Sequence, residues 1–458
     1  MTKQIRINAF TQCSICPQSK GQWKNPADHS SAGYRDLDYW IDLAKTLERG
    51  CVDALFFADV HGVYDVFGGS MNAGIQHAVQ FPGNDPTTLA TVLARETQHL
   101  GLIFTLSTTY YPPFHAAKLF SSLDHFTGGR VGWNIVTSYL ESAYKNGLGS
   151  QPLEHDERYD QADEYLDVAY KLWEHSWEED AVSRDVHADV HTDPTKVHRI
   201  NHNGQYYSVQ GPHMCEPSPQ RTPFLVQAGQ SGRGTEFGAK HAEALFCGFR
   251  DIQEAKEKTR TIRDLCEANG RPRDAIKVLP GVCIVCAPTE QEAQEKYREY
   301  LSYSSPEGAL ALFGGWTGID LAGLEPESVL DNMESQGMQF LAQWFNSDDP
   351  NNRATLMDVM EYMSIGSLAK VVVGTPAQIA DYLEAMVDEA DVDGFNVIPV
   401  AQPASALELV DLVIPELQRR GRFRTHYEGN TLRENFSHTS HPRLDPTHHA
   451  FTLSLESP

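Results

Sequence analysis

The sequence predicts an α/β protein, a (β/α)8 TIM barrel with long insertions at its C-terminal face and a C-terminal arm. Short apolar or β-branched runs alternate with amphipathic stretches along the chain, which is typical of parallel strands joined by crossover helices. Eight such runs can be counted, and eight strands close this kind of barrel. We therefore expect residues 1–420 to form a single barrel and residues 421–458 to form a C-terminal extension.

The expected strands are short and rich in Val, Ile, Leu and Phe, as are strands that are buried on both faces. Amphipathic segments between them are the expected crossover helices, and Thr375-Pro376 offers an N-cap and a first helical position for one more helix. The expected strands are 5–10, 53–60, 100–109, 130–138, 223–229, 243–249, 276–287 and 394–400, and the expected helices are about 36–50, 113–126, 157–174, 232–241, 251–268, 288–302 and 405–419.

Two stretches are longer than ordinary loops, at about 60–99 and about 303–374. In a barrel, long excursions at the C-terminal face of the sheet build the substrate pocket. The second stretch contains "LFGGWTGIDL" and "MQFLAQWF", whose Phe, Trp and Leu side chains we expect to cover an apolar cavity. Helical periodicity is lost beyond residue 420, so we expect residues 421–458 to lie over a neighbouring subunit or over the barrel surface.

Composition excludes several classes of partner. The chain has 458 residues, 41% of them hydrophobic, and a formal net charge of -25. That charge repels phosphate backbones and anionic lipid headgroups, so we expect no nucleic acid and no membrane as partner. The N-terminus lacks the apolar segment of a signal peptide, and no run of about 18 apolar residues occurs, which predicts a cytoplasmic protein.

Two CxxC pairs raise the question of a metal or redox site. Eight cysteines are too few for a disulfide scaffold in so long a chain. Cys283 and Cys286 lie in an expected strand, where residues three apart point to opposite faces and cannot chelate one ion. Cys13 and Cys16 follow the first strand at the expected active-site face, which suggests pocket lining or plain packing.

Histidine spacing offers no better metal site. His187 and His191 are four apart, but they lie in a polar segment without an accompanying Glu, so a solvated surface is the simpler interpretation. The HxH motif that metal-dependent barrel hydrolases carry after the first strand is replaced by Asn8-Ala9-Phe10. We therefore predict that the protein binds no metal.

A Gly-rich turn after the fifth expected strand could bind an anion. The segment "QAGQSGRGTEFG" runs from a strand into a helix, where glycines allow close backbone approach and free helix amides donate to a phosphate. His155 and Tyr159 lie four apart at another helix start, so they reach the same side. Separately, these features also fit an ordinary turn and a capped surface helix. Together they suggest a phosphate-bearing cofactor at the barrel mouth, and no GxGxxG motif indicates a nicotinamide domain.

Several collinear blocks carry a resemblance to a known family. They include "DALFFADVHGVYD", "STTYYPPFHAAKLFSSLDHFTGGRVGWNIVTS", "LEHDERYDQADEYLDVAYKLW", "KVHRINHNGQYYSVQGPH" and "PSPQRTPFLVQAGQSGRG". Over nearly the whole chain the sequence resembles the bacterial luciferase-like flavin monooxygenases, in the branch of the nitrilotriacetate, dibenzothiophene sulfone, dimethyl sulfide and long-chain alkane monooxygenases.

The resemblance implies a two-component enzyme. It would bind FMN as FMNH2, delivered by a separate NAD(P)H:flavin reductase, and react it with O2 to a C4a-(hydro)peroxyflavin that oxidises a small-molecule substrate. It would also be a homodimer or a homotetramer. Carried over residue by residue, Asp59 and Thr105 would contact the isoalloxazine, Asn134, Thr137 and Ser138 would lie along the flavin edge, and His155, Tyr159, Gly229 and Ser231 would hold the ribityl phosphate.

The chain departs from the alkane enzymes of this branch. Those enzymes resemble one another in a Cys and a His after the first strand, a His after the "VTS" block and a His in the late insertion. The matching positions here are Ser14, Pro17, Tyr139 and Leu312. The departure points away from an alkane and toward another small neutral molecule, organosulfur, aromatic or apolar, and the lack of an Arg cluster disfavours an aminopolycarboxylate.

Two tyrosines are the candidate catalytic residues. Tyr64 and Tyr139 could donate a proton or a hydrogen bond to the activated oxygen, although both could equally be packing aromatics. Three alternatives to the monooxygenase stay open: a deazaflavin-dependent oxidoreductase, a flavin-degrading lyase and a non-catalytic flavin-binding protein. The expected substrate-pocket residues are Phe10, Cys13, Ser14, Leu312, Phe313 and Trp316.

Overall fold

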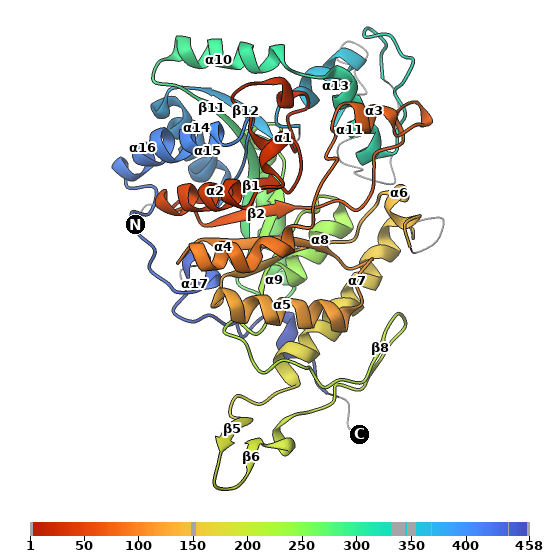
Figure 1. The fold of residues 1–458 in the computed structure, drawn as a ribbon, viewed down its shortest axis with the longest axis vertical. Coiled ribbons are helices and arrows are strands. Elements are labelled where there is room, and N and C mark those ends of the chain that lie inside the picture. Colours follow the sequence, from red (N-terminus) through yellow and green to blue (C-terminus); the bar gives the residue numbers. More distant parts are fainter. Residues whose placement is uncertain are drawn as a thin grey trace.

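The computed structural model describes residues 3–147, 153–330, 344–345, 354–367, 369–437 and 439–455. Eight parallel strands form a closed barrel with helices around it, which confirms the predicted fold class (Figure 1). Each of the eight predicted strands contributes one barrel strand. In their order around the barrel these are β1 (Arg6–Gln12), β2 (Ala54–Ala58), β3 (Gly101–Ser107), β4 (Val131–Val136), β9 (Phe224–Gln227), β10 (Ala244–Cys247), β11 (Lys277–Cys286) and β13 (Gly394–Ile398).

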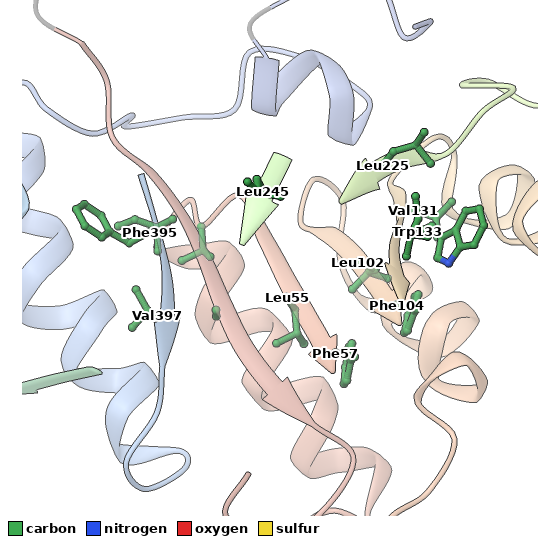
Figure 2. Close-up of a cluster of buried hydrophobic side chains, with 14 of the residues drawn as sticks. Leu55, Phe57, Leu102, Phe104, Val131, Trp133, Leu225, Leu245, Phe395 and Val397 are labelled. Carbon is green, nitrogen blue, oxygen red and sulfur yellow. The ribbon is translucent and has the colours of Figure 1, made fainter. Parts of the chain in front are cut away.

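Side chains alternate between the barrel interior and the surrounding helices. Leu55 and Phe57 of β2 belong to the core between strands and helices, whereas Phe56 belongs to the interior cluster. Figure 2 shows the outward-facing side chains of β2 together with those of neighbouring strands. Inside, the rings of Phe10, Phe56 and Phe246 lie with their centroids 5.8 to 6.1 Å apart. These rings fill the centre of the barrel with apolar atoms below the strand ends.

Each helix that the amphipathic periodicity predicts is present, and further short helices occur outside the predicted ranges. Helix α8 has the predicted bounds, and Thr375 caps α14 in a reciprocal capping box with Gln378. π-Helical turns at 171–175 and 409–413 follow α7 and α15. The helices are α1 (Ser30–Gly33), α2 (Leu37–Arg49), α3 (Asn72–Gln76), α4 (Ala90–Glu96), α5 (Pro113–Thr127), α6 (Glu141–Tyr144), α7 (His155–Tyr170), α8 (Gly232–His241), α9 (Ile252–Ala268), α10 (Glu290–Ser302), α11 (Pro306–Thr317), α13 (Leu356–Ser364), α14 (Pro376–Ala390), α15 (Ala404–Glu408), α16 (Ile414–Arg419) and α17 (Leu432–Ser437).

The long excursions contain more regular structure than we expected. The stretch 60–99 includes α4, which is the crossover helix between β2 and β3. The stretch 303–374 ends in a ninth strand, β12 (Lys370–Gly374), which pairs with β11 outside the closed ring. Its run of three valines is not among the expected strands, because the strand has only five residues and those before Gly374 are exposed or half-buried.

A third excursion was missed between α7 and β9. It holds two small antiparallel hairpins, one formed by β5 (Val182–Asp185) with β6 (Val190–Thr192) and one formed by β7 (His202–Asn203) with β8 (Ser208–Val209). In Figure 1 they project at the bottom of the molecule, whereas α11 and α13 lie at its upper right. Since most of their side chains are exposed or half-buried, hydrophobic periodicity could not reveal them.

The C-terminal extension packs on its own barrel. Leu432 and Phe436 of α17 belong to the interior cluster and contact the amino ends of the strands, where a Cβ on Gly101 would lie 2.4 Å from Leu432. The guanidinium of Arg433, fully buried beside them, bonds both carboxylate oxygens of Glu243 at 2.6 and 2.9 Å. Helix α17 therefore closes the barrel at the end opposite its mouth.

Among the helices that the structure describes, none is both long enough and apolar enough to cross a bilayer.

Candidate active site

A cavity of about 240 Å³ opens at the carboxyl ends of the barrel strands. The strand ends and the loops that follow them supply its walls, as in other parallel barrels. The lining includes thirteen of the residues that sequence reasoning selected: Phe10, Asp59, Tyr64, Thr105, Asn134, Thr137, Ser138, Tyr139, His155, Tyr159, Gly229, Ser231 and Trp316.

Four of the selected residues do not line this cavity. Leu312 and Phe313 are fully buried in the cluster that joins α11 to α13, one helical turn from Trp316, which does line it. Ser14 is buried and forms a bridge with Gly83. Cys13 packs in the outer core, with its Sγ 3.5 Å from the carbonyl oxygen of Tyr34. The structure therefore does not bring these four side chains to the cavity wall.

The first CxxC pair also lacks the electrostatics of a reactive thiol site. Burial raises the pKa of Cys13 to about 11. Burial, together with the neighbouring Asp28 carboxylate, raises the pKa of Cys16, whose Sγ lies 3.3 Å from Asp28 Oδ2. Both thiols stay protonated at neutral pH and are poor nucleophiles. In the second pair, Cys283 lies inside the barrel and Cys286 in the outer core, as the strand geometry predicts.

Polar side chains at the ends of β3 and β4 bond to one another. Thr105 Oγ1 donates to the carbonyl oxygen of Phe57 at 2.8 Å and accepts from Asn134 Nδ2 at 2.8 Å. Asn134 Oδ1 is buried and bonds no atom of the described residues. The hydroxyls of Ser107 and Ser138 lie 2.7 Å apart. This wall of the cavity thus offers a fixed row of donors and acceptors, one of which still needs a partner.

Helices α7 and α8 meet in what we term the anion corner, formed by Tyr159, Gly229, Ser231 and the first turn of α8. Ser231 Oγ caps α8 by accepting from the amide of Gly234 at 3.0 Å. Burial raises the pKa of Tyr159, while its hydrogen bonds to Ser231 and Thr137 oppose that rise. The first amides of a helix lack intrahelical acceptors and carry the positive end of its dipole, so this corner favours a negatively charged group.

The anion corner has room only because position 229 is glycine. A Cβ there would lie 2.1 Å from Gln227 Nε2 and 2.9 Å from the hydroxyl of Tyr159. Position 232, at the start of α8, has no atom within 4 Å of a Cβ, so the helix start faces open space. Arg158 and His155 also line the cavity beside it. Close backbone approach, helix amides and hydroxyl donors are the features that a phosphate group requires.

A second polar network lies on the wall formed by α11 and the loop after β2. Tyr64 donates its hydroxyl proton to Gln80 Oε1 at 2.7 Å and accepts from Trp316 Nε1 at 3.1 Å. It is also hydrogen-bonded to Tyr139. Burial raises the pKa of Tyr64 to about 12 and also raises the pKa of Tyr139 well above its ordinary value. Both phenols are therefore neutral, and the proton of Tyr64 is already engaged.

Asp59 and His61 lie together at the end of β2. The carboxylate Oδ2 of Asp59 is 3.6 Å from His61 Nε2, and Oδ1 accepts from the amide of Val60 at 2.9 Å. Burial, with the nearby Asp85 carboxylate, raises the pKa of Asp59 to about 7. Burial lowers the pKa of His61, although Asp85 opposes this. Among the described lining residues, this carboxyl group is the one whose pKa moves into the neutral range.

Sequence reasoning missed several lining residues. Gln227 and Cys247 are the last residues of β9 and β10, so their position at strand ends was a usable signal. Gln18 and Gln80 come from separate loops and meet through Pro17, whose carbonyl oxygen accepts from Gln80 Nε2 at 3.0 Å. No spacing in the sequence signals such a contact. Other lining residues that were missed are Gln12, Phe56, His61, Ser107, Tyr110, Arg158, Gln230 and Phe246.

Within the ranges that the structure describes, no group of three or more His, Cys, Asp or Glu side chains is arranged to hold a metal ion.

The closed barrel, with a cavity and an anion corner at its carboxyl end, defines an enzyme of the (β/α)8 barrel class. Residues 20–393 match the luciferase-like monooxygenase family. The chain belongs to that family and is a monooxygenase, an oxidoreductase.

Three relatives are similar over nearly their whole length. The dimethyl-sulfide monooxygenase of Hyphomicrobium sulfonivorans is 46% identical over 450 residues, which are 98% of this chain and 94% of the relative, and its crystal structure has a TM-score of 0.91. The long-chain alkane monooxygenase of Geobacillus thermodenitrificans is 44% identical over 98% of this chain and 97% of its own, with a TM-score of 0.91. A riboflavin lyase, solved with modified FMN and riboflavin, is 36% identical with a TM-score of 0.91, covering 98% of this chain and 99% of its own.

Proposed function

We propose that the protein is a two-component, FMNH2-dependent monooxygenase that oxidises a small neutral organosulfur, aromatic or apolar compound with O2. The anion corner is the observation that carries this proposal, because it offers a phosphate site beside a cavity lined by polar strand ends. The family of the chain supports the reaction class.

The polar groups around the cavity fit an FMN molecule. Tyr159, Ser231 and the first amides of α8 would bind the ribityl phosphate in the space left by Gly229, with His155 beside them. Thr105 and Asn134 would face the flavin ring, and the unpartnered Asn134 Oδ1 would accept from a ring N–H group. Asp59, Thr137 and Ser138 line the same cavity and would complete this contact surface.

Reduced FMN, when bound, supplies the electrons that activate O2. The protein would contribute orientation and a dry environment, because Phe10, Phe56 and Phe246 place aromatic rings beneath the cavity. Tyr64 and Tyr139 would present neutral phenols to the substrate end. Since Tyr64 already donates its proton to Gln80, Tyr139 is the donor in the bond between the two phenols. Tyr139 would therefore accept a hydrogen bond from the reacting oxygen, or donate to that oxygen in place of Tyr64.

The lining favours an uncharged substrate. Of the lining residues, Arg158 and His155 lie beside the anion corner, and Asp59 and His61 lie near the flavin-facing wall. The other described lining residues, among them Trp316, have uncharged side chains, so a carboxylate beside them would find no cation in the described part of the wall. We further propose a separate NAD(P)H:flavin reductase as the source of FMNH2, and a homodimer or homotetramer as the assembly.

A flavin-degrading lyase is the second candidate. It is supported by the riboflavin lyase whose structure is 36% identical to this chain with a TM-score of 0.91. In that case a flavin would occupy the substrate end of the cavity as well.

The deciding experiment supplies the protein with FMN, a flavin reductase, NADH and a panel of sulfides, sulfones, aromatic compounds, alkanes and riboflavin. The monooxygenase should consume O2 in step with product, transfer label from ¹⁸O2 to the product and release less hydrogen peroxide when the true substrate is added. Labelled product from riboflavin alone would support the lyase. Failure to bind FMN or FMNH2 would refute both.

A further inference from the structure

Helix α7 presents one row of side chains to α8 and to the C-terminal segment. Tyr159, Asp163, Asp167 and Tyr170 are spaced by four, four and three residues, so they share one face of the helix. Tyr159 belongs to the anion corner at one end of this row. The other three side chains lie beyond the cavity and are not part of its lining.

Asp163 of α7 forms hydrogen bonds with residues at both ends of α8. Its Oδ1 accepts from His241 Nε2 at 2.6 Å and from Lys240 Nζ at 3.0 Å, both in the last turn of α8. Its Oδ2 accepts from the guanidinium of Arg233 in the first turn. The side chain of Asp163 is only 20% exposed, so these bonds are shielded from water. One carboxylate therefore connects the two ends of the ten-residue helix.

The charge state of this carboxylate follows from its neighbours. Burial lowers the pKa of His241 to about 4, so its ring is neutral, with Nε2–H donating to Asp163 and Nδ1 accepting from the hydroxyl of Tyr170 at 3.1 Å. Burial alone would raise the pKa of Asp163, but His241, Arg233 and Lys240 together hold it well below its usual range. Asp163 is thus an ionised acceptor at neutral pH, and its bonds to Arg233 and Lys240 are charge-assisted.

The C-terminal segment anchors the far end of the same assembly. His448 Nε2 donates to the backbone carbonyl of His241 at 2.9 Å, and His449 Nε2 lies 2.8 Å from Asp167 Oδ1. His448 is fully buried. With the last turn of α8 fixed in this way, the position of its first turn depends on the bonds of Arg233 to the shielded Asp163 and, at 2.9 Å, to the exposed Asp160 of α7.

That first turn is also part of the anion corner. Arg233 follows Gly232 directly, and its guanidinium carbon lies 5.9 Å from the ring centroid of Tyr159. A Cβ on Gly234 would lie 2.7 Å from the hydroxyl of Tyr159 and 2.9 Å from Ser231 Oγ. With so little clearance, a small shift of this turn changes the distances among the donors that face a phosphate.

We propose that Asp163 is a positioning residue for the anion corner: it holds the first turn of α8 against Tyr159 and so fixes the phosphate donors. The inference rests on the proposed function, since it takes the bound anion to be the phosphate of FMN. Asp163 does not touch the flavin, so its removal should weaken recognition of the phosphate and leave recognition of the ring unchanged.

The test compares two flavins that differ in the phosphate. Dissociation constants for FMN and riboflavin are measured by fluorescence titration of the full-length wild type, Asp163→Asn and Asp163→Glu. We expect Asp163→Asn to bind FMN about 10-fold more weakly and riboflavin as the wild type does, and Asp163→Glu to recover part of the loss. Inorganic phosphate should also compete less well with FMN in Asp163→Asn than in the wild type.

Glu164→Gln is the matched control. Glu164 is the next residue on α7, but it binds His202 and the backbone amides of the β7–β8 hairpin and lies away from α8. This variant should keep the wild-type ratio of FMN to riboflavin affinity. If Asp163→Asn does not fold, Arg233→Gln removes the link to Asp163 together with the bond to Asp160, and it should show a split between the two flavins at least as large.

The outcomes separate the two proposals. An unchanged FMN affinity, an equal loss for both flavins, or the same loss in Glu164→Gln would overturn the positioning role while leaving the proposed function intact. A wild-type protein that binds FMN no better than riboflavin would overturn the phosphate assignment, and the positioning role with it.

Discussion

Substituting Gly229 with alanine perturbs the anion corner through one added methyl group. Gly229 is outside the left-handed φ region, so its backbone accepts an alanine, and only the neighbouring side chains oppose it. The new Cβ would lie 2.1 Å from Gln227 Nε2, whereas ordinary contact begins at 3.4 Å, so this amide must retreat by about 1.3 Å (3.4 − 2.1). The Tyr159 hydroxyl, at 2.9 Å, must retreat by about 0.5 Å (3.4 − 2.9).

These displacements determine how much folding stability and FMN affinity the substitution should cost. Overpacking a buried site costs about 1 to 3 kcal/mol of folding stability. The methyl group occupies space beside the phosphate site and displaces the Tyr159 hydroxyl, so the phosphate should lose the benefit of a charge-assisted hydrogen bond worth about 1.5 to 3 kcal/mol, and FMN affinity should fall by roughly 10- to 100-fold. Riboflavin affinity should fall less, because riboflavin has no phosphate to lose.

The assay is a pair of fluorescence titrations, with FMN and with riboflavin, beside a thermal melt of the free protein. Gly147→Ala is the control, because a Cβ at position 147 has no atom within 4 Å. A Gly229→Ala variant that binds FMN within about twofold of the wild type would refute the reasoning. So would a loss that is equal for both flavins.

Three further substitutions address the polar walls of the cavity. In the free protein, Asp59 releases its proton near pH 7 but in the unfolded chain near pH 4, so its contribution to stability falls as the pH rises between these values. The melting temperature of Asp59→Asn should therefore rise relative to that of the wild type as the pH increases from 5 to 8. A difference in melting temperature that does not change with pH would contradict the raised pKa of Asp59. Tyr64→Phe leaves Gln80 Oε1 and Trp316 Nε1 without their partner and should lower the free energy of unfolding by about 1 to 3 kcal/mol in a denaturant titration. Tyr139→Phe keeps those two bonds but removes the one between Tyr139 and Tyr64. Expressed as free energies, its loss of kcat/KM should exceed its loss of stability, and the opposite result would assign Tyr139 a packing role.

Residues at strand ends were the predictable part of the site. Gly229 ends its expected strand and Asp59 lies next to the end of its own, while Thr105 and Asn134 lie within theirs and reach the cavity from inside the barrel. In a closed parallel barrel the carboxyl ends of all strands meet at one face, so topology alone brings these side chains together. Only the residue-level assignment to flavin contacts required the resemblance to a family.

Residues in long loops were not predictable in this way. Cys13 follows the first strand as closely as the others follow theirs, yet its side chain turns into the outer core against Tyr34. Gln18 and Gln80 reach the cavity from loops on either side of β2. The direction of a loop side chain depends on backbone turns and packing partners, and no periodicity records these.

The sequence by itself determined the barrel, its eight strands and most of its crossover helices, because hydrophobic periodicity and capping residues act over a few neighbouring positions. Tertiary structure alone decided the pairing of β12 with β11, the closure of the barrel by α17 and the junction of α7 with α8 at Asp163. Each of these joins residues far apart in the chain. Their contacts arise from burial and charge pairing in the folded state, which local sequence patterns do not encode.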